Sequence, residues 1–222
     1  MHWRARRITL WLAGFRPSRL PYETFRVVQE LRALWSALNA RASAKWWGVQ
    51  LGRSCKFYGV PRFLRKPGSG ITIGNGCVFR SAEWAGTAGI SRACLFATTV
   101  PGAVLSIGNK CGFSGTVISA KCGIRIGNNV LCGANTTILD SDRHAVDPVL
   151  RAQGDAGVSL AVTIEDDVWL GMNVTVLKGV TIGKGSVVGA NSTVVGDIPP
   201  MSVAAGSPAR VIGPVVQGNP SA

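Results

Sequence analysis

The sequence predicts an all-β solenoid of short parallel strands, preceded by an α-helical segment. Three observations predict this fold class: an aliphatic period of six residues, an abundance of glycine, and an N-terminal stretch where helical spacing replaces the period. The chain has 222 residues, of which 28 are glycine and 46% are hydrophobic. It can therefore bury a sizeable core while making many tight turns.

The six-residue period is clearest in the last third of the chain. Aliphatic anchors recur at Ile164, Leu170, Val176, Ile182, Val188 and Val194. A small or branched residue follows each anchor by four: Val168, Val174, Val180, Ser186, Ser192 and Ile198. Neither a helix nor an alternating strand repeats every six residues. The period fits one side of a triangular coil, and coils of about 18 residues would stack at strand spacing. We therefore expect Ile164 under Ile182, Leu170 under Val188 and Val176 under Val194.

Weaker copies of the period extend back to Leu51 and account for most of the six cysteines. Cys55, Cys77 and Cys111 occupy the small inward position, and Cys132 is an anchor. A chain of this length with a good core does not need disulfides. We predict reduced thiols that fill the core, with Cys94 and Cys122 fitting less cleanly.

Several motifs resemble the hexapeptide-repeat acetyltransferases. They are Ile126-Gly-Asn-Asn-Val130, Val168-Trp-Leu-Gly171, Ile182-Gly-Lys-Gly-Ser-Val-Val-Gly-Ala190, Asp197-Ile-Pro-Pro200 and Ala205-Gly-Ser-Pro-Ala-Arg210. The resemblance runs from about Val49 to Ile212 and points to the sugar O-acetyltransferases of surface-polysaccharide pathways and the maltose/galactoside acetyltransferases. It implies a left-handed parallel β-helix, a homotrimer with sites between subunits, and acetyl-CoA as the donor.

The period breaks between Asp142 and Val162, which predicts a loop insertion over 143–162. Insertions that leave a rigid solenoid often carry function. The chain has two histidines, and His2 lies in the N-terminus, so His144 is the candidate general base for a hydroxyl nucleophile. Asp-x-His followed by proline also resembles the catalytic motif of the family. The alternative is an ordinary surface histidine.

Three carboxylates flank His144. We predict that Asp142 orients the imidazole and that Asp140 binds a substrate hydroxyl. The alternatives are a corner role for Asp140 and a turn role for Asp147 before Pro148. By resemblance, Ser114 occupies the position where relatives carry an asparagine facing the reacting centre, and a hydroxyl there can bind substrate.

The resemblance also implies a donor site along the late coils. It assigns the pantetheine arm to Gly171, Met172, Gly189 and Ala190, and the nucleotide phosphates to Arg210. A solvated charge is the alternative for Arg210. No metal is expected, because the γ-class carbonic anhydrases of this fold need three histidines per zinc and the solenoid has only His144.

The N-terminal segment is strongly basic. Residues 1–66 hold 14 Lys and Arg against two acidic residues, Glu23 and Glu30, which gives a net charge of +12. Residues 67–222 hold 10 Lys and Arg against 9 Asp and Glu. An amphipathic helix is predicted over 22–45, with apolar positions Phe25, Val28, Leu31, Leu34, Trp35 and Leu38. Five of the seven tryptophans fall at Trp3, Trp11, Trp35, Trp46 and Trp47. This helix suits either an anionic membrane surface or packing on the trimer; nucleic acid is not expected, because no nucleic-acid motif accompanies the charge.

The predicted organisation is a helical segment over 1–47, a β-helix domain over 48–212 and a tail over 213–222. The predicted function is O-acetyl transfer from acetyl-CoA to a saccharide or lipid-linked glycan precursor. A serine-type amino acid acceptor and a non-catalytic scaffold are the alternatives. No run reaches the ~18 apolar residues of a membrane span, and the short run Ile8–Phe15 lacks a cleavage site. We expect a cytoplasmic protein, with residues 1–47 as a candidate peripheral contact with the inner membrane face.

Overall fold

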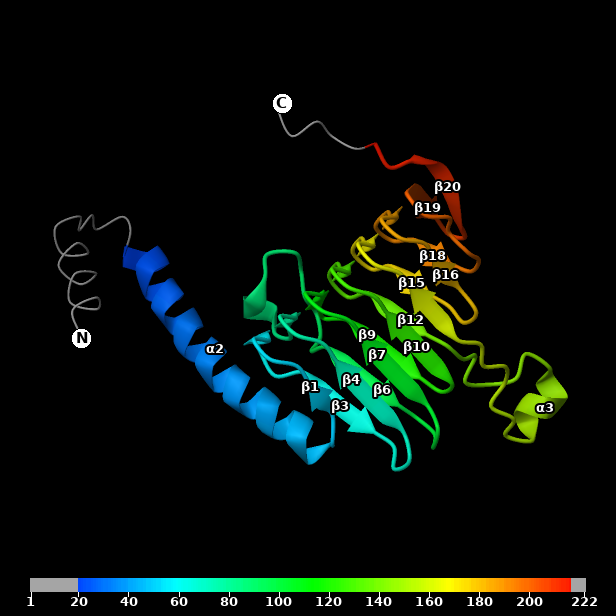
Figure 1. Ribbon diagram of the computed structural model, residues 1–222, viewed down its shortest axis with the longest axis horizontal. Helices are drawn as coiled ribbons and strands as arrows, with labels where there is room; N and C mark the ends of the chain where they lie inside the picture. Colours follow the sequence, from blue (N-terminus) through cyan, green and yellow to red (C-terminus); the bar gives the residue numbers. More distant parts are fainter. Residues whose placement is uncertain (1–19, 217–222) are drawn as a thin grey trace.

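A computed structural model describes residues 20–216 as a three-sided parallel β-helix with a long helix at its N-terminal end (Figure 1). The first side contains β1 (Gln50–Leu51), β4 (Gly70–Ile73), β7 (Val104–Ile107), β10 (Gly123–Ile126), β13 (Val162–Ile164) and β16 (Thr181–Ile182). The second contains β2 (Lys56–Tyr58), β5 (Val78–Arg80), β8 (Gly112–Ser114), β11 (Leu131–Cys132), β14 (Trp169–Leu170), β17 (Val187–Val188), β19 (Ser202–Gly206) and β20 (Ala209–Pro214). The third contains β3 (Arg62–Arg65), β6 (Leu95–Thr98), β9 (Val117–Ala120), β12 (Thr137–Leu139), β15 (Thr175–Val176) and β18 (Thr193–Val194).

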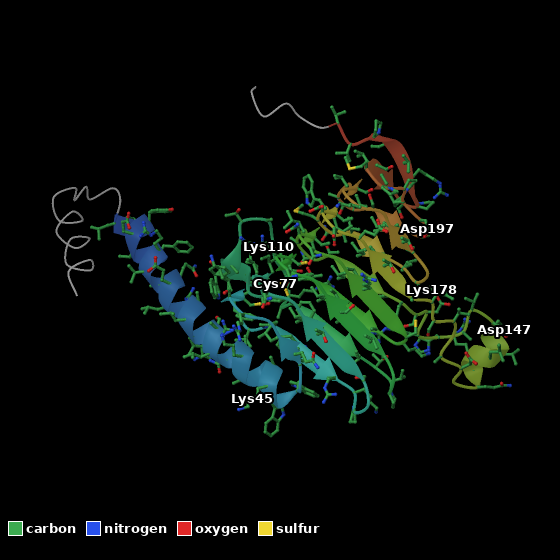
Figure 2. The ribbon with its side chains drawn as sticks, in the orientation of Figure 1. Lys45, Cys77, Lys110, Asp147, Lys178 and Asp197 are labelled. Carbon is green, nitrogen blue, oxygen red and sulfur yellow. The ribbon has the colours of Figure 1, made fainter. Side chains whose placement is uncertain are left out.

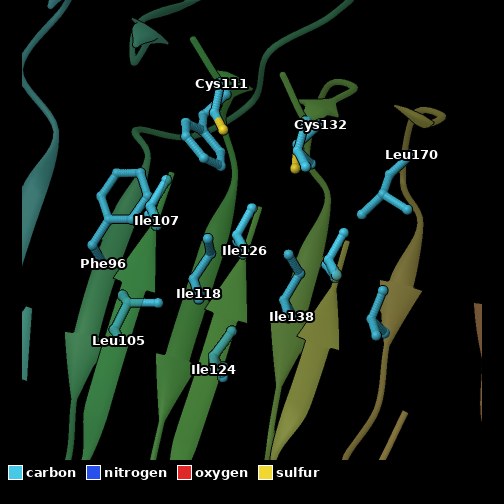
Figure 3. Close-up of a cluster of buried hydrophobic side chains, with 14 of the residues drawn as sticks. Phe96, Leu105, Ile107, Cys111, Ile118, Ile124, Ile126, Cys132, Ile138 and Leu170 are labelled. Carbon is cyan, nitrogen blue, oxygen red and sulfur yellow. The ribbon is translucent and has the colours of Figure 1, made fainter. Parts of the chain in front are cut away.

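The strand register confirms the predicted aliphatic ladders. Ile164 pairs with Ile182, Leu170 with Val188 and Val176 with Val194. All six anchors are buried. Each of these strands therefore points its anchor side chain into the core at the position that is in register with the anchor of the paired strand. Figure 3 shows ladders of the same kind in the preceding coils, where Ile107 pairs with Ile126 and Ile118 with Ile138. The strict period of six is therefore the length of one side of the coil.

Aromatic rings and thiols fill the wider early coils. Phe57, Phe79 and Phe113 stack along the second side with ring centroids 5.0 and 5.5 Å apart. Cys55, Cys77 and Cys111 stack beside them at an inner corner and are buried. A hydrogen bond with the Cys111 thiol raises the pKa of Cys77 to about 11, which suits a neutral, core-filling group.

All six cysteines are free thiols. Cys94 and Cys132 are also buried, whereas Cys122 is exposed. The predicted core role is thus confirmed for Cys55, Cys77, Cys111 and Cys132, and Cys94, which fitted the period less cleanly, is buried as well. Cys122 differs because it lies on the corner after the third side, where its side chain leaves the interior.

Two insertions interrupt the coils. The first covers residues 82–94, includes the 3₁₀ turn η2 (Glu83–Ala85), and was not predicted. Arg92 fastens it to the next coils by donating to the Gly115 and Asn135 carbonyls and to Thr137 Oγ1. The second covers residues 140–161 between β12 and β13 and contains α3 (Pro148–Ala152). It corresponds to the loop predicted over 143–162 and projects from the solenoid (Figure 1).

The N-terminal helix α2 runs from Leu20 to Trp46, which confirms the helix predicted over 22–45. Its buried residues are Ser36, Ala40 and Ala44, so small side chains pack against the first coil. The large apolar side chains predicted to form one face are exposed instead. No helix within residues 20–216 combines the length and apolarity needed to cross a bilayer. His2, Trp3, Trp11 and the tail beyond residue 216 lie outside the described residues.

Candidate active site

Asp140 forms the base of the loop that carries the histidine, which we call the His loop (residues 140–161). Its carboxylate accepts hydrogen bonds from the backbone amides of Lys121, Cys122 and Gly123 at 2.7–2.8 Å. The side chain is fully buried. Both carboxylate oxygens thus accept hydrogen bonds from the preceding coil, and neither is accessible to a sugar hydroxyl. The prediction that Asp140 contacts the substrate is therefore wrong. Asp140 instead has the structural role at a corner of the coil that was its alternative interpretation.

Asp142 anchors the His loop to the following coil. Its Oδ1 accepts from Lys178 Nζ at 2.5 Å, with both side chains largely covered. Its backbone amide also donates to the Val158 carbonyl at 3.0 Å. Only one carboxylate oxygen is used by Lys178, so the other can accept a second hydrogen bond.

His144 is exposed on the His loop, and the backbone around it is held on both sides. Arg143, with φ of 66°, donates to Ser119 Oγ at 2.7 Å. On the other side, Gly157 passes so close that a Cβ there would lie 2.6 Å from the His144 carbonyl oxygen. The main chain of His144 is therefore fixed while its imidazole faces outward.

Asp147 has a local role further along the same loop. It is the N-cap of α3, and its Oδ1 accepts from the amides of Val149 and Leu150. The turn alternative for Asp147 therefore describes its role well. Of the three carboxylates flanking His144, only Asp140 uses both oxygens on backbone amides, whereas Asp142 and Asp147 each accept through Oδ1. Asp142 is the one of these two that is anchored to the rigid coils, which favours it as the group that supports the imidazole. Figure 2 shows Lys178 at the solenoid edge and Asp147 out on the loop.

The residues assigned to the donor lie at another corner, between the second and third sides. We call this the donor corner: residues 171–173, 189–191 and 205–208. A Cβ on Gly171 would lie 2.7 Å from the Ala190 amide nitrogen, and one on Gly189 would lie 3.1 Å from Ala205 Cβ. Stacking of the coils therefore already requires small residues here. Met172 and Ala190 are exposed beside them.

The hairpin of β19 and β20 closes the donor corner at the C-terminal end. The Gly206 amide donates to Ser192 Oγ, and Ser207 Oγ donates to Thr193 Oγ1, each at 3.0 Å. Arg210 is exposed on β20, and its Nη1 donates to the Ala209 carbonyl. Its remaining donors face solvent, as a phosphate-binding cation requires.

Ser114 ends β8 on the second side and opens onto the same edge as the donor corner. Residues of the first insertion pack against the adjacent Gly115, because a Cβ there would lie 3.0 Å from the Arg92 carbonyl oxygen. The insertion 82–94 therefore borders the position of Ser114. Its signal in the sequence was only a slip in the period after Phe79.

One whole side of the coil separates the donor corner from the His loop within a chain. The third side runs from Asn173 to Lys178, which at about 3.3 Å per residue is roughly 16 Å. The structure therefore brings Ser114, Gly171, Met172, Gly189, Ala190 and Arg210 to one edge and Asp142 and His144 to another. Within one chain the structure therefore does not bring the two groups of predicted site residues together.

Lys178 is a site residue that the sequence reasoning missed. The available signal was charge stacking: Ile138 pairs with Val176, so Lys178 lies one coil above Asp140 and close to Asp142. Within residues 20–216, no group of three or more His, Cys, Asp or Glu side chains is arranged to hold a metal ion.

The stacked three-sided coils form a left-handed parallel β-helix. Residues 161–196 match the bacterial transferase hexapeptide family (six repeats), and the resemblance to the hexapeptide-repeat acetyltransferases is confirmed.

The galactoside O-acetyltransferase of Lactococcus lactis is 51% identical over 88 residues, covering 40% of this chain and 42% of that protein. The chain spans about two fifths of the length of the curated relatives it matches.

Solved structures share the fold over most of the chain. A hexapeptide-repeat containing acetyltransferase from Vibrio cholerae O1 biovar eltor, complexed with acetyl coenzyme A, matches with a TM-score of 0.50 and 25% identity, covering 92% of this chain and 94% of that chain. AntD, an N-acyltransferase from Bacillus cereus solved with dTDP and coenzyme A, matches with a TM-score of 0.59 and 18% identity, covering 78% and 88%. The latter likeness concerns the fold alone.

Proposed function

We propose that this protein is an O-acetyltransferase that moves an acetyl group from acetyl-CoA to a hydroxyl of a saccharide or glycan precursor. The observation that carries the proposal is an exposed histidine on a firmly anchored loop at the edge of a hexapeptide-repeat β-helix. The galactoside O-acetyltransferase relative supports the saccharide class. The acetyl coenzyme A complex of the Vibrio cholerae neighbour supports the donor.

In this mechanism His144 acts as the general base. Its imidazole accepts the proton of the acceptor hydroxyl while the oxygen forms a bond to the thioester carbonyl carbon. The C–S bond then breaks, and the coenzyme A thiolate leaves and takes the proton from the imidazolium. The products are an O-acetyl ester and free coenzyme A thiol. His144 is the only histidine among residues 20–216.

Asp142 is the proposed positioning residue. Lys178 holds one of its oxygens, so its direction is fixed by the rigid coil above the loop. The second oxygen is free to accept from an imidazole nitrogen, which stabilises the protonated ring. Asp142 and Lys178 would thus hold the imidazole of His144 in a fixed position relative to the solenoid.

The proposed site lies between subunits of a homotrimer. The His loop of one copy would face the donor corner of the next, where Gly171, Met172, Gly189 and Ala190 leave room for the thin pantetheine arm. Arg210 would meet the nucleotide phosphates, and Ser114 would contact the acceptor. The separation of the two sets by a full coil side supports this arrangement.

The proposed location follows from the donor, since a cytoplasmic enzyme has direct access to acetyl-CoA. A lipid-linked glycan would be reached at the inner face of the membrane. An amino acid acceptor remains the competing substrate class, and the acceptor panel below includes it.

The decisive experiment measures release of the coenzyme A thiol with acetyl-CoA and a panel of sugars, lipid-linked glycans and serine. His144→Ala should lower kcat on the best acceptor by about 10²–10⁴, because it removes the base. The KM for acetyl-CoA and the melting temperature should stay close to wild type.

Two results would contradict different parts of the proposal. Absence of acetyl-CoA binding by the wild-type protein would exclude the transferase function. Retention of more than about a tenth of kcat by His144→Ala would exclude the base but leave the transferase function standing.

A further inference from the structure

The exposed side of α2 carries a continuous row of large apolar side chains. We call it the apolar stripe: Leu20, Val27, Val28, Leu31, Leu34, Trp35, Leu38 and Trp46. Their exposed fractions lie between 39% and 86%. At 3.6 residues per turn these positions share one side of the helix. Single exposed apolar residues are ordinary, but a contiguous patch of this kind marks an interaction surface.

The contacts of α2 with the body of the protein are concentrated in its second half. The buried residues Ser36, Ala40 and Ala44 all lie in that half. The first half leans away from the solenoid (Figure 1). A helix without packing is marginally stable in water, and α2 has 27 residues, or about 40 Å of length. Its first half contacts the body through Arg32, whose guanidinium lies 5.7 Å from the centre of the Trp84 ring, and leaves its large apolar side chains open to a partner.

The same end of the molecule is strongly cationic. Between Glu30 and Glu83 the sequence has no acidic residue. It holds nine cations there: Arg32, Arg41, Lys45, Arg53, Lys56, Arg62, Arg65, Lys66 and Arg80. None of the nine forms an ion pair with residues 20–216. Residues 1–19 add five arginines and no acid.

We propose that the apolar stripe and these cations form a docking surface for an anionic lipid bilayer. The helix would lie in the interface, with leucines and valines in the acyl boundary and tryptophans at its edge. The cations of the first coil, such as Arg53, Lys56 and Arg62, would face the lipid phosphates and carboxylates.

Charge favours a bilayer over the other possible partners. Pairing the stripes of two copies would bring two cationic ends together. A nucleic acid would satisfy the cations but leave the leucines and valines in water. An anionic membrane matches both features at once. This inference goes beyond the proposed function and does not rest on it, since binding is measured without catalysis.

The test is co-sedimentation of the full chain with phosphatidylcholine vesicles that contain about 30% phosphatidylserine or none. The wild-type protein should bind the anionic vesicles at least tenfold more tightly than the neutral ones. Raising the salt concentration should weaken that binding, because ions screen the surface charge.

Two sets of variants separate the contributions. Leu31→Ser, Leu34→Ser and Leu38→Ser together should lower vesicle affinity by more than about tenfold, because each removes buried apolar surface. Val146→Ser, Val149→Ser and Ile212→Ser remove equally exposed apolar groups away from α2 and should leave affinity unchanged.

A second set of variants removes positive charges, again with matched controls elsewhere in the chain. Replacing Arg53, Lys56 and Arg62 by Gln should lower affinity by about fivefold per charge. The same change at Lys110, Arg125 and Lys184, which lie outside the basic end, should have little effect. Circular dichroism and melting curves establish that each variant is folded.

Each outcome decides the proposal. Selective binding to anionic vesicles, lost in the stripe variant and kept in its control, supports it. Binding that survives loss of the stripe, or equal binding to both vesicles, overturns it. Absence of vesicle binding together with a change of mass in light scattering for the stripe variant would also overturn it, and would assign the stripe to another copy of the chain.

Discussion

The ion pair of Asp142 and Lys178 joins the His loop to the rigid coils. It links a residue two positions before His144 to the coil that follows the loop. Because small displacements of a catalytic group cost large factors in rate, we expect this pair to influence the proposed catalysis more than folding. It also distinguishes Asp142, whose partner is a side chain on the next coil, from Asp140 and Asp147, which accept hydrogen bonds from backbone amides.

Lys178→Met should therefore lower kcat by about tenfold or more while leaving the KM for acetyl-CoA near its original value. Asp142→Asn should have a similar effect, and the double variant should lose little more, because the two act as one unit. Lys184→Met is the matched control, since Lys184 pairs with Asp167 at 3.8 Å on an exposed corner. Additive losses in the double variant would contradict a shared role.

Cys122 is the one thiol outside the core. Burial, followed by the nearby Asp140 carboxylate, raises its pKa above the ordinary value of 9.0. Since the thiolate is the reactive form, its modification should be slow at neutral pH and should accelerate as the pH rises above 9. Native protein should titrate one thiol per chain, whereas unfolded protein should titrate all six. A native thiol count that stays at one in Cys122→Ser would mean that a buried cysteine is reactive.

The His loop is an ordered element because its two arms pair with each other. Ser141 and Ser159 form an antiparallel bridge, and the Leu160 amide donates to the Asp140 carbonyl. The close passage of Gly157 beneath His144 is the tightest point of this arrangement.

Gly157→Ala tests whether that passage sets the position of the base. Gly157 has φ of +69° and no room for a Cβ, whereas Gly154 has φ of +84° with open space around it. Both substitutions strain the backbone, but only Gly157→Ala should displace His144. Its kcat should fall about tenfold to a hundredfold, and its melting temperature should be no higher than that of Gly154→Ala, because its Cβ also meets the His144 backbone. Equal rates in the two variants would show that the contact is not needed for activity.

At the scale of the whole molecule, the β-helix is a rigid prism whose candidate site residues occupy two different edges. Such a prism cannot bend to bring His144 to the donor corner of its own chain, because the coils are held by continuous parallel ladders. In the proposed mechanism, assembly of several copies would join the two edges.

Subunit mixing tests this directly. His144→Ala and a variant with a blocked donor corner, Ala190→Arg, should each be inactive. Co-expressed together, they should regain about a quarter of wild-type activity, because a quarter of the interfaces pair an intact loop with an intact corner. Light scattering should give three times the chain mass of 23.3 kDa. An inactive mixture of demonstrably mixed trimers would place the whole site within one chain.

The sequence by itself determined the solenoid, the strand register, the buried cysteines, the helix α2 and the position of the His loop. These features depend on short-range periodicity, and a strict period of six has one regular solution in a stacked coil. It also singled out His144, because the solenoid has no second histidine.

Only the tertiary structure decided the features that depend on contacts between coils. Asp140 is buried and accepts hydrogen bonds from three backbone amides, and Asp142 pairs with Lys178. Arg92 links the insertion over residues 82–94, which was not predicted, to the next coils. The tertiary structure also turned the small face of α2 inward and the apolar stripe outward, since both faces are compatible with the same helical pattern. Such choices follow from which side chains meet across a coil or an edge, and sequence spacing does not contain that information.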